Sequence, residues 1–398
     1  MGQGGGLMLV LVATRSSGDV VEQPGRTPMR TSTRPPHPLH PTPCPYRTLG
    51  RKHLNGYDYP IRSSTFIRVD EKICRQTGVR SSILSFKSFY ASDIHGSELL
   101  WRKFTNAASF YGVEVLIMGG DIAGKAVVPI VRRNTSFYAP AVTGEQAFTE
   151  DQLPALERRI RDLGQYPYHM TEDELAAVQN DQSAIDALFL QIMIETLERW
   201  LRLAEERLRG KGVRLYVMLG NDDEPALREV LARSSIAVDP EDHVVELGEG
   251  FQMISCGFAN PTPWHSPREM PEEELQRHLE KLAGQLVEPA RSVFNLHVPP
   301  IQTAIDTAPV VDENLSPVIQ GGSVLMGPAG SKAVRAVIEE YQPLVALHGH
   351  IHESRGTAKI GKTVCINPGS AYGEGVLHGA LFELDKRKGL KRYQLTSG

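Results

Sequence analysis

Cysteine is scarce in this chain. Its 398 residues include four cysteines (Cys44, Cys74, Cys256 and Cys365), and no two of them form a Cys-x-x-Cys pair. This scatter argues against a zinc ribbon and against a disulfide framework. Because such cysteine usage is typical of a reducing compartment, we expect a cytoplasmic protein.

Long apolar runs are absent as well. No stretch approaches the ~18 consecutive apolar residues that a membrane-spanning helix requires. The apolar residues 7–13 form a short run with no basic residue before it, which argues against a signal peptide. We therefore expect a soluble protein with no membrane partner.

An excess of positive charge is also missing, since the formal net charge is −4. Residues 1–80 hold twelve Lys and Arg against five Asp and Glu, which leaves 31 against 42 in residues 81–398. An acidic body without basic residues interleaved with aromatic ones argues against long nucleic acid as the ligand. We predict that the basic, proline-rich residues 1–80 form a disordered extension.

Residues 81–398 alternate between strand-like and helix-like patterns, which is typical of an α/β domain. Strands are predicted at 83–91, 113–118, 213–219, 243–247, 251–256, 291–296, 363–366, 377–384 and 391–395. Helices are predicted at 97–111, 225–232, 271–286 and 331–341.

Two segments interrupt this alternation. Residues 125–211 contain helical patterns at 149–163, 171–178 and 182–209 after a short hairpin, so we predict an inserted helical cap. Residues 301–327 form a long loop rich in glycine and proline, and such loops in compact domains are more often functional than idle. We expect the cap and the loop to shape a substrate pocket.

Residues whose side-chain nitrogen or oxygen atoms can bind a metal follow five of the predicted strands. They are Asp93-x-His95, Gly120-Asp121, Gly220-Asn221, His297 and His350-x-His352, the last following the apolar residues 344–347. In open α/β sheets, ligands bind beyond the carboxyl ends of the strands. Nitrogen and oxygen donors without thiolate suit Mn²⁺, Fe²⁺, Fe³⁺ or Zn²⁺. A single strand-end histidine is commonly structural, but five such strand ends in one chain indicate a site for two metal ions.

In this order, the motifs resemble those of the calcineurin-like metallophosphoesterase superfamily, which read Asp-x-His, Gly-Asp, Gly-Asn-His, His and Gly-His-x-His. The resemblance covers about residues 83–384 without the insertion at 125–211. It implies a four-layered α/β/β/α sandwich around a two-metal centre. It also implies the ligands: Asp93, His95 and His352 for one ion, Asn221, His297 and His350 for the other, and Asp121 as the bridge.

One position departs from the family pattern. Where the third motif of the family has histidine, which contacts the substrate and acts on the leaving group, this chain has Asp222. Three readings remain open. Asp222 acts as a general acid with a raised pKa, or His265 from a neighbouring loop takes the acid role, or the leaving group needs little assistance.

The resemblance implies a metal-dependent hydrolase, a phosphodiesterase or phosphatase. Two ions about 3.5–4 Å apart can produce a bridging hydroxide that attacks a phosphoester in line. We expect a small substrate such as a nucleotide or cyclic nucleotide, and no feature fixes an oligomeric state. The alternative is a non-catalytic, metal-binding scaffold on the same fold.

Overall fold

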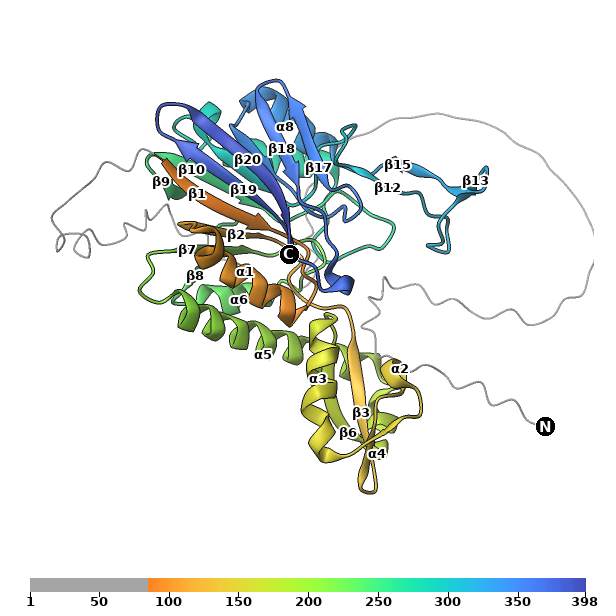
Figure 1. Ribbon diagram of the computed structural model, residues 1–398. Coiled ribbons are helices and arrows are strands. Elements are labelled where there is room, and N and C mark those ends of the chain that lie inside the picture. Colours follow the sequence, from red (N-terminus) through yellow and green to blue (C-terminus); the bar gives the residue numbers. More distant parts are fainter. Residues whose placement is uncertain (1–84) are drawn as a thin grey trace, which may run out of the picture. The chain divides into compact units, whose positions relative to one another are not determined.

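Two six-stranded sheets make up the centre of the domain in the computed structural model, which describes residues 85–398 (Figure 1). The predicted extension at 1–80 lies outside the described residues. The first sheet has the order β20 (Gly389–Ser397), β19 (His378–Asp385), β1 (Ser85–Ala91), β2 (Val115–Gly119), β7 (Arg214–Met218) and β8 (Ala237–Val238). The second has the order β17 (Gly356–Ile360), β18 (Thr363–Asn367), β16 (Val345–Leu347), β11 (Val293–Leu296), β10 (Phe251–Cys256) and β9 (Val245–Gly248).

The strands that precede the predicted ligands run parallel to one another within each sheet. In the first sheet β1, β2 and β7 are parallel, and in the second β10, β11, β16 and β18 are parallel. Parallel strands bring their carboxyl ends to the same edge of a sheet. The residues that follow β1, β2 and β7 therefore gather at one edge of the first sheet, and those that follow β11 and β16 gather at one edge of the second.

The two sheets pack face to face through alternate side chains of their strands. In β1, Phe86 and Tyr90 point into the layer between the sheets, whereas Phe89 points to the outer face. This follows from the two-residue period of a strand. The ring of Phe86 meets the ring of Phe251 from the second sheet at a centroid distance of 5.9 Å.

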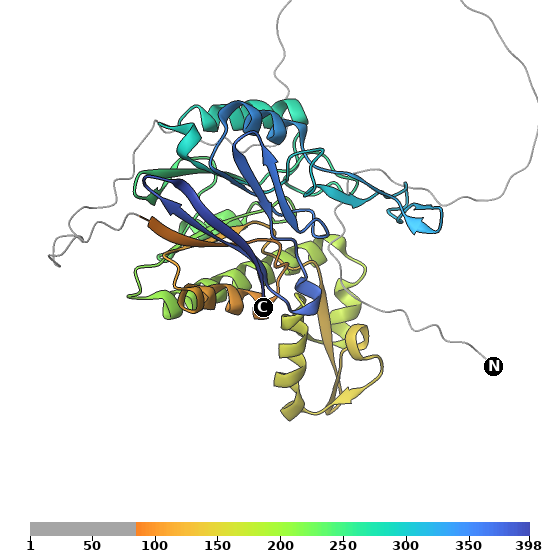
Figure 2. The same ribbon diagram turned by 45° about the horizontal axis from the view of Figure 1, so that its top comes forward.

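Helices cover the outer face of each sheet. The first sheet is covered by α1 (Glu98–Tyr111), α5 (Gln182–Leu208) and α6 (Leu227–Ala232), and the second by α7 (Glu272–Ala283) and α8 (Lys332–Tyr341) (Figure 2). Ser97 and Ser331 cap the amino ends of α1 and α8 by accepting backbone N–H groups. The layers are helix, sheet, sheet and helix, so the predicted fold class is confirmed.

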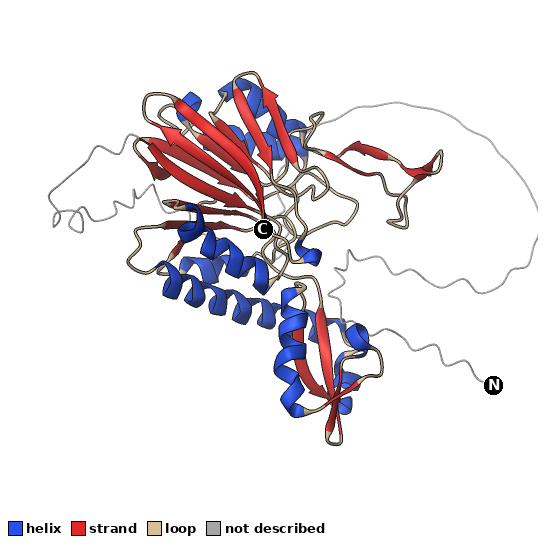
Figure 3. Cartoon of the chain, in the orientation of Figure 1, coloured by secondary structure: helices blue, strands red, loops and turns tan. Residues whose placement is uncertain are grey.

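The insertion predicted at 125–211 contains the predicted hairpin and helices, but it is not a purely helical cap, because its first part holds a four-stranded sheet (Figure 3). Its elements are β3 (Val127–Arg133), β4 (Ser136–Tyr138), α2 (Pro140–Thr143), β5 (Ala147–Phe148), α3 (Leu153–Asp162), β6 (Tyr166–Thr171) and α4 (Glu172–Val178). The strand order is β5, β4, β3, β6. β6 lies outside the predicted strands, and Pro167 interrupts its strand pattern.

The long helix α5 belongs to the main domain rather than to the insertion. The indole of Trp200 in α5 stacks on that of Trp101 in α1, with ring centroids 5.3 Å apart. The Trp101 indole N–H also donates to the carbonyl of Trp200 at 2.9 Å. An apolar stripe predicts that a helix is buried but not which partner buries it, so the sequence did not distinguish these packings.

The segment predicted as the loop 301–327 forms short hairpins. Its strands are β12 (Thr307–Pro309), β13 (Ile319–Gln320), β14 (Ser323–Val324) and β15 (Met326–Pro328). β12 pairs with β15, and β13 pairs with β14. Within residues 85–398, no helix is long and apolar enough to span a bilayer.

The packing of α5 on α1 can be tested by substitution. Trp200→Ala should lower the free energy of unfolding of the whole domain by about 3–5 kcal/mol, because it removes a fully packed aromatic side chain. Arg202→Ala on the exposed face of α5 is the control and should change it by less than about 0.5 kcal/mol. Chemical denaturation followed by far-UV circular dichroism measures both, and equal effects would contradict this packing.

Candidate metal centre

The loops after five strands bring the predicted ligands together. Three groups of candidate donor atoms form, with the atoms of each group within 4.8 Å of one another, and two of the groups consist of predicted ligands alone. The first group contains Asp93, His95 and His352, and the second contains Asp121, His297 and His350. Asn221 joins the second group through its side-chain oxygen, 2.7 Å from Nδ1 of His350.

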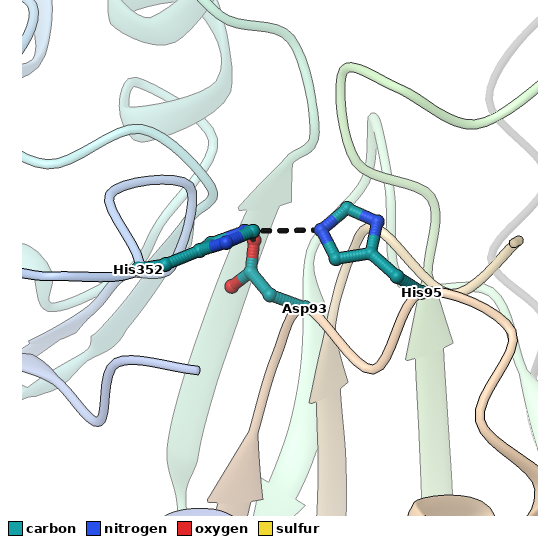
Figure 4. A group of neighbouring side chains, drawn as sticks. All are labelled: Asp93, His95 and His352. Atoms are coloured by element: carbon teal, nitrogen blue, oxygen red, sulfur yellow. Dashed lines mark hydrogen bonds and ion pairs between the residues drawn. The ribbon is translucent and has the colours of Figure 1, made fainter. Parts of the chain in front are cut away.

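In the first group two imidazoles face each other (Figure 4). The Nε2 atoms of His95 and His352 are 3.0 Å apart, and Nε2 of His352 is 3.4 Å from Oδ1 of Asp93. Two neutral imidazoles that direct lone pairs at each other repel, unless a proton or a cation lies between them. This geometry suits a proton shared in an N–H···N hydrogen bond or a cation bound by both rings.

In the second group a hydrogen bond outside the site fixes the donor atom of His297. Its Nδ1 donates to the carbonyl oxygen of Gly119 at 2.8 Å, so Nε2 is directed at the carboxylates. Nε2 lies 3.4 Å from Oδ1 of Asp121, is fully buried, and has no hydrogen-bond partner among the described residues. Metal-binding histidines are typically oriented by such a bond to a carbonyl.

The carboxylate of Asp121 faces both groups. Its Oδ2 is 3.7 Å from Nε2 of His95, and its Oδ1 is 3.4 Å from Nε2 of His297. The backbone N–H of Asp222 also donates to Oδ1, at 3.0 Å. Asp121 thus has the position that a bridging ligand requires, while its role as a ligand stays a prediction.

The backbone of the site adopts a conformation that non-glycine residues rarely take. The φ angles are 56° at Asp93, 38° at His95, 50° at Asp121 and 65° at His350. Each such residue costs of order 1–3 kcal/mol, and such residues cluster at functional sites. The loops accept this strain in order to direct four side chains to one place.

The buried ionisable groups of the centre shift one another's pKa values. Burial favours the neutral form of Asp121, but the imidazoles of His297 and His95 outweigh it and hold the pKa of that carboxyl well below its usual range. Burial would lower the pKa of His297, but the carboxylates of Asp121 and Asp93 raise it to about 9. Burial and the charge of His297 lower the pKa of His350 to about 4. The cluster therefore combines carboxylates with a positively charged His297.

These residues fit a cation-binding site on three observations. The donor set contains only nitrogen and oxygen atoms, which suits Mn²⁺, iron or Zn²⁺. The buried Nε2 of His297 lacks a hydrogen-bond partner among the residues that the structure describes, and the Nε2 atoms of His95 and His352 meet at 3.0 Å. A cation bound between these nitrogen and oxygen donors would be coordinated by them.

The structure separates the two residues that were predicted to act as acids. Asp222 lies beside the centre, since one of its carboxylate oxygens is grouped with donor atoms of His95 and Asp121. His265 has an exposed side chain, and among the described contacts none joins its ring to the centre. Its neighbour Ser266 faces inward instead and accepts a hydrogen bond from Nδ2 of Asn221 at 2.7 Å.

Sequence reasoning missed two charged residues at the centre. Lys125 forms an ion pair with Asp222, in which Nζ lies 2.5 Å from Oδ2. Asp223 is fully buried and accepts the backbone N–H groups of Ile122, Ala123 and Gly220 at 2.7–3.1 Å. The second Asp after Gly220-Asn221 was the available signal for Asp223, whereas no spacing rule pointed to Lys125.

No protein-family model matches this chain. The uncharacterized protein MJ1162 of Methanocaldococcus jannaschii is 27% identical over 178 residues, which are 44% of this chain and 70% of that protein.

Solved structures resemble the chain at low sequence identity. The protein TT1561 of Thermus thermophilus is 13% identical, with a TM-score of 0.42 over 79% of this chain and 98% of that one. An archaeal phosphodiesterase is 12% identical, with a TM-score of 0.30 over 78% and 99%. The fold that the metallophosphoesterase resemblance implies is the fold observed in residues 85–398.

Metal content tests the grouping directly. Metal-free protein that is titrated with Mn²⁺ and then desalted should retain about two equivalents per chain by elemental analysis. Asp121→Asn should retain about one or fewer, because the shared carboxylate serves both groups. Asp151→Asn, an exposed residue of the insertion, is the control and should match the wild type. Equal metal content in Asp121→Asn and wild type would contradict a shared ligand.

Metal binding should also release a proton. His297 is protonated at neutral pH in the metal-free protein because its pKa is about 9, whereas a metal ligand must be the neutral imidazole. The apparent affinity for Mn²⁺ should rise by up to about tenfold per pH unit from about pH 7 and level off above about pH 9. Calorimetry in buffers of different ionisation enthalpy counts the protons, and identical heats in all buffers would sink the assignment.

Proposed function

We propose that this protein hydrolyses small phosphoesters at a centre of two metal ions, either Mn, Fe or Zn. One observation carries the proposal: two groups of buried Asp and His donors lie where parallel strands of both sheets end, and Asp121 of the second group is 3.7 Å from His95 of the first. The ligand assignment is the one that the metallophosphoesterase resemblance implies. A metal pair with a shared carboxylate is typical of enzymes that displace a group at phosphorus.

Bound ions supply positive charge for the phosphoryl oxygens and lower the pKa of a coordinated water molecule. The residues of the chain supply the rest. The bond from His297 to the Gly119 carbonyl and the bond from Asp222 N–H to Asp121 hold the donors in a fixed orientation. Such preorganisation is the main protein contribution to catalysis of charge-developing reactions.

Exposure supports approach from one side. Asp93, His95, Asp121 and His297 are almost completely buried, whereas the side chains of His352 and Asp222 are 27% and 24% exposed. We therefore propose that a phosphoester approaches from the side on which His352 and Asp222 are exposed. A nucleotide or cyclic nucleotide fits the acidic body better than a long nucleic acid does. Each of the seven ligand positions of the family motifs holds a residue that can bind a metal, so a non-catalytic scaffold is not favoured.

Activity assays test the proposal. Purified protein with Mn²⁺ should cleave bis-p-nitrophenyl phosphate, p-nitrophenyl phosphate or both, followed by a panel of nucleotides and cyclic nucleotides. Asp121→Asn should lower kcat/KM by at least about 100-fold, since even residues that only support a metal ligand cost up to about that much. Asp151→Asn again serves as the matched control.

The enzymatic proposal fails if wild type cleaves neither ester and Asp121→Asn equals wild type on the whole panel. About two metal equivalents per chain without turnover would instead support the scaffold. Comparison of the diester with the monoester also decides between phosphodiesterase and phosphatase activity.

A further inference from the structure

A positively charged side chain, Lys125, lies beside the centre, and it belongs neither to the motifs nor to the candidate ligands. Lys125 lies in the loop between β2 and β3, after the Gly120-Asp121 motif and at the entrance to the insertion. Its Nζ is 2.5 Å from Oδ2 of Asp222, which occupies the position where the family motif has histidine. The side chains of Lys125 and Asp222 are 51% and 24% exposed, so the pair is accessible from solvent.

The pair lies against the candidate ligands. A carboxylate oxygen of Asp222 is within 4.8 Å of a donor atom of His95 and of one of Asp121. The charge of Lys125 lies close enough to lower the pKa of both of these groups. Lys125 is thus at the rim of the centre, on the side of Asp222.

The backbone around Lys125 is held in place. The N–H of Gly124 donates to the hydroxyl of Tyr166 at 2.7 Å. A side chain at Gly124 has no room, because its Cβ would lie 2.4 Å from the carbonyl oxygen of Gly164. Position 124 therefore needs glycine. This close packing fixes the backbone position from which the side chain of Lys125 extends.

The ion pair of Lys125 and Asp222 reduces the negative charge that an anionic substrate would meet. Asp93 and Asp121 already place two carboxylates at the centre, and Asp222 alone would add a third negative charge beside an anionic substrate. Lys125 neutralises that charge. An ammonium has three N–H donors, and Asp222 is the partner of Nζ within residues 85–398, so the remaining donors can serve phosphoryl oxygens.

We infer that Lys125 is the phosphoryl-binding cation of this centre and that Asp222 positions it, the two together replacing the histidine of the family motif. This inference rests on the proposed phosphoester hydrolysis. It assigns Asp222 a positioning role in place of the acid role. The insertion at 125–211 accordingly contributes its first residue to the substrate site.

Lys125→Met removes the charge and keeps the length of the side chain. It should lower kcat/KM on bis-p-nitrophenyl phosphate by about 10²–10³-fold, the typical loss of one donor to developing charge. It should also weaken inhibition by inorganic phosphate by at least about tenfold. Lys125→Arg should recover most of both losses, and Asp222→Asn should show a smaller loss of the same kind.

The controls separate this role from folding and metal binding. Lys359→Met, an exposed lysine of β17, should match the wild type in all assays. Metal content and melting temperature of Lys125→Met should equal those of wild type, since Lys125 binds no metal. If Lys125→Met fails to fold, Lys125→Gln replaces it in the same assays.

Two results would overturn the inference. Wild-type kcat/KM and phosphate inhibition in Lys125→Met would exclude a phosphoryl contact, while loss of activity in Asp121→Asn would leave the proposed hydrolysis standing. A loss of metal in Asp222→Asn but not in Lys125→Met would make Asp222 a ligand instead. If wild type hydrolyses no ester, the proposed function fails, and a phosphate-induced rise in melting temperature that Lys125→Met lacks still tests the phosphate site.

Discussion

Hydrogen bonds that cross between the two sheets at the carboxyl ends of their strands hold both the fold and the centre. His297, after β11, donates to the carbonyl of Gly119 in β2. The carboxylate of Asp93, after β1, accepts the backbone N–H of His350 at 3.0 Å, and the carbonyl of Asp93 accepts the hydroxyl of Ser370 at 2.6 Å. Because each bond joins one sheet to the other, the sheets cannot shift relative to each other without separating the donors. Residues of the candidate site are therefore also residues that fix the packing of the domain.

This arrangement concentrates unfavourable features that a bound cation would offset. Four residues carry left-handed backbone, and Asp93 and Asp121 are buried carboxylates. The buried Asp223 adds a further acidic group, whose pKa burial and the charge of Asp121 raise to about 7. Backbone N–H groups stabilise the Asp223 carboxyl group. The metal-ligand candidates, in contrast, mainly face one another. A ligand that binds only the folded state stabilises it, so cation binding and stability of this edge are physically linked.

The sequence predicted the parts of this structure that depend on local pattern. β10 was expected at 251–256 and runs from Phe251 to Cys256, and the seven candidate ligands follow strands as expected. The sequence did not predict in which direction some side chains point or which distant residues they contact. His265 and Ser266 are neighbours, and only the turn, with φ of 50° at His265, decides which of them faces Asn221. Lys125 reaches Asp222 across 97 residues of chain, a contact that no spacing rule encodes.

The insertion meets the centre through backbone rather than through a flexible linker. A Cβ at Gly164 would lie 2.2 Å from the carbonyl oxygen of His95, so the chain of the insertion touches the Asp-x-His turn directly. The hydroxyl of Ser97 also donates to the carbonyl of Asp162 at 2.8 Å. Tilting the insertion away from the sheet would break these contacts and displace the turn that carries Asp93 and His95. The insertion is therefore a fixed wall of the site. Because the chain enters this wall at Lys125, the geometry of the ligands and the position of the Lys125 ammonium depend on the same packing.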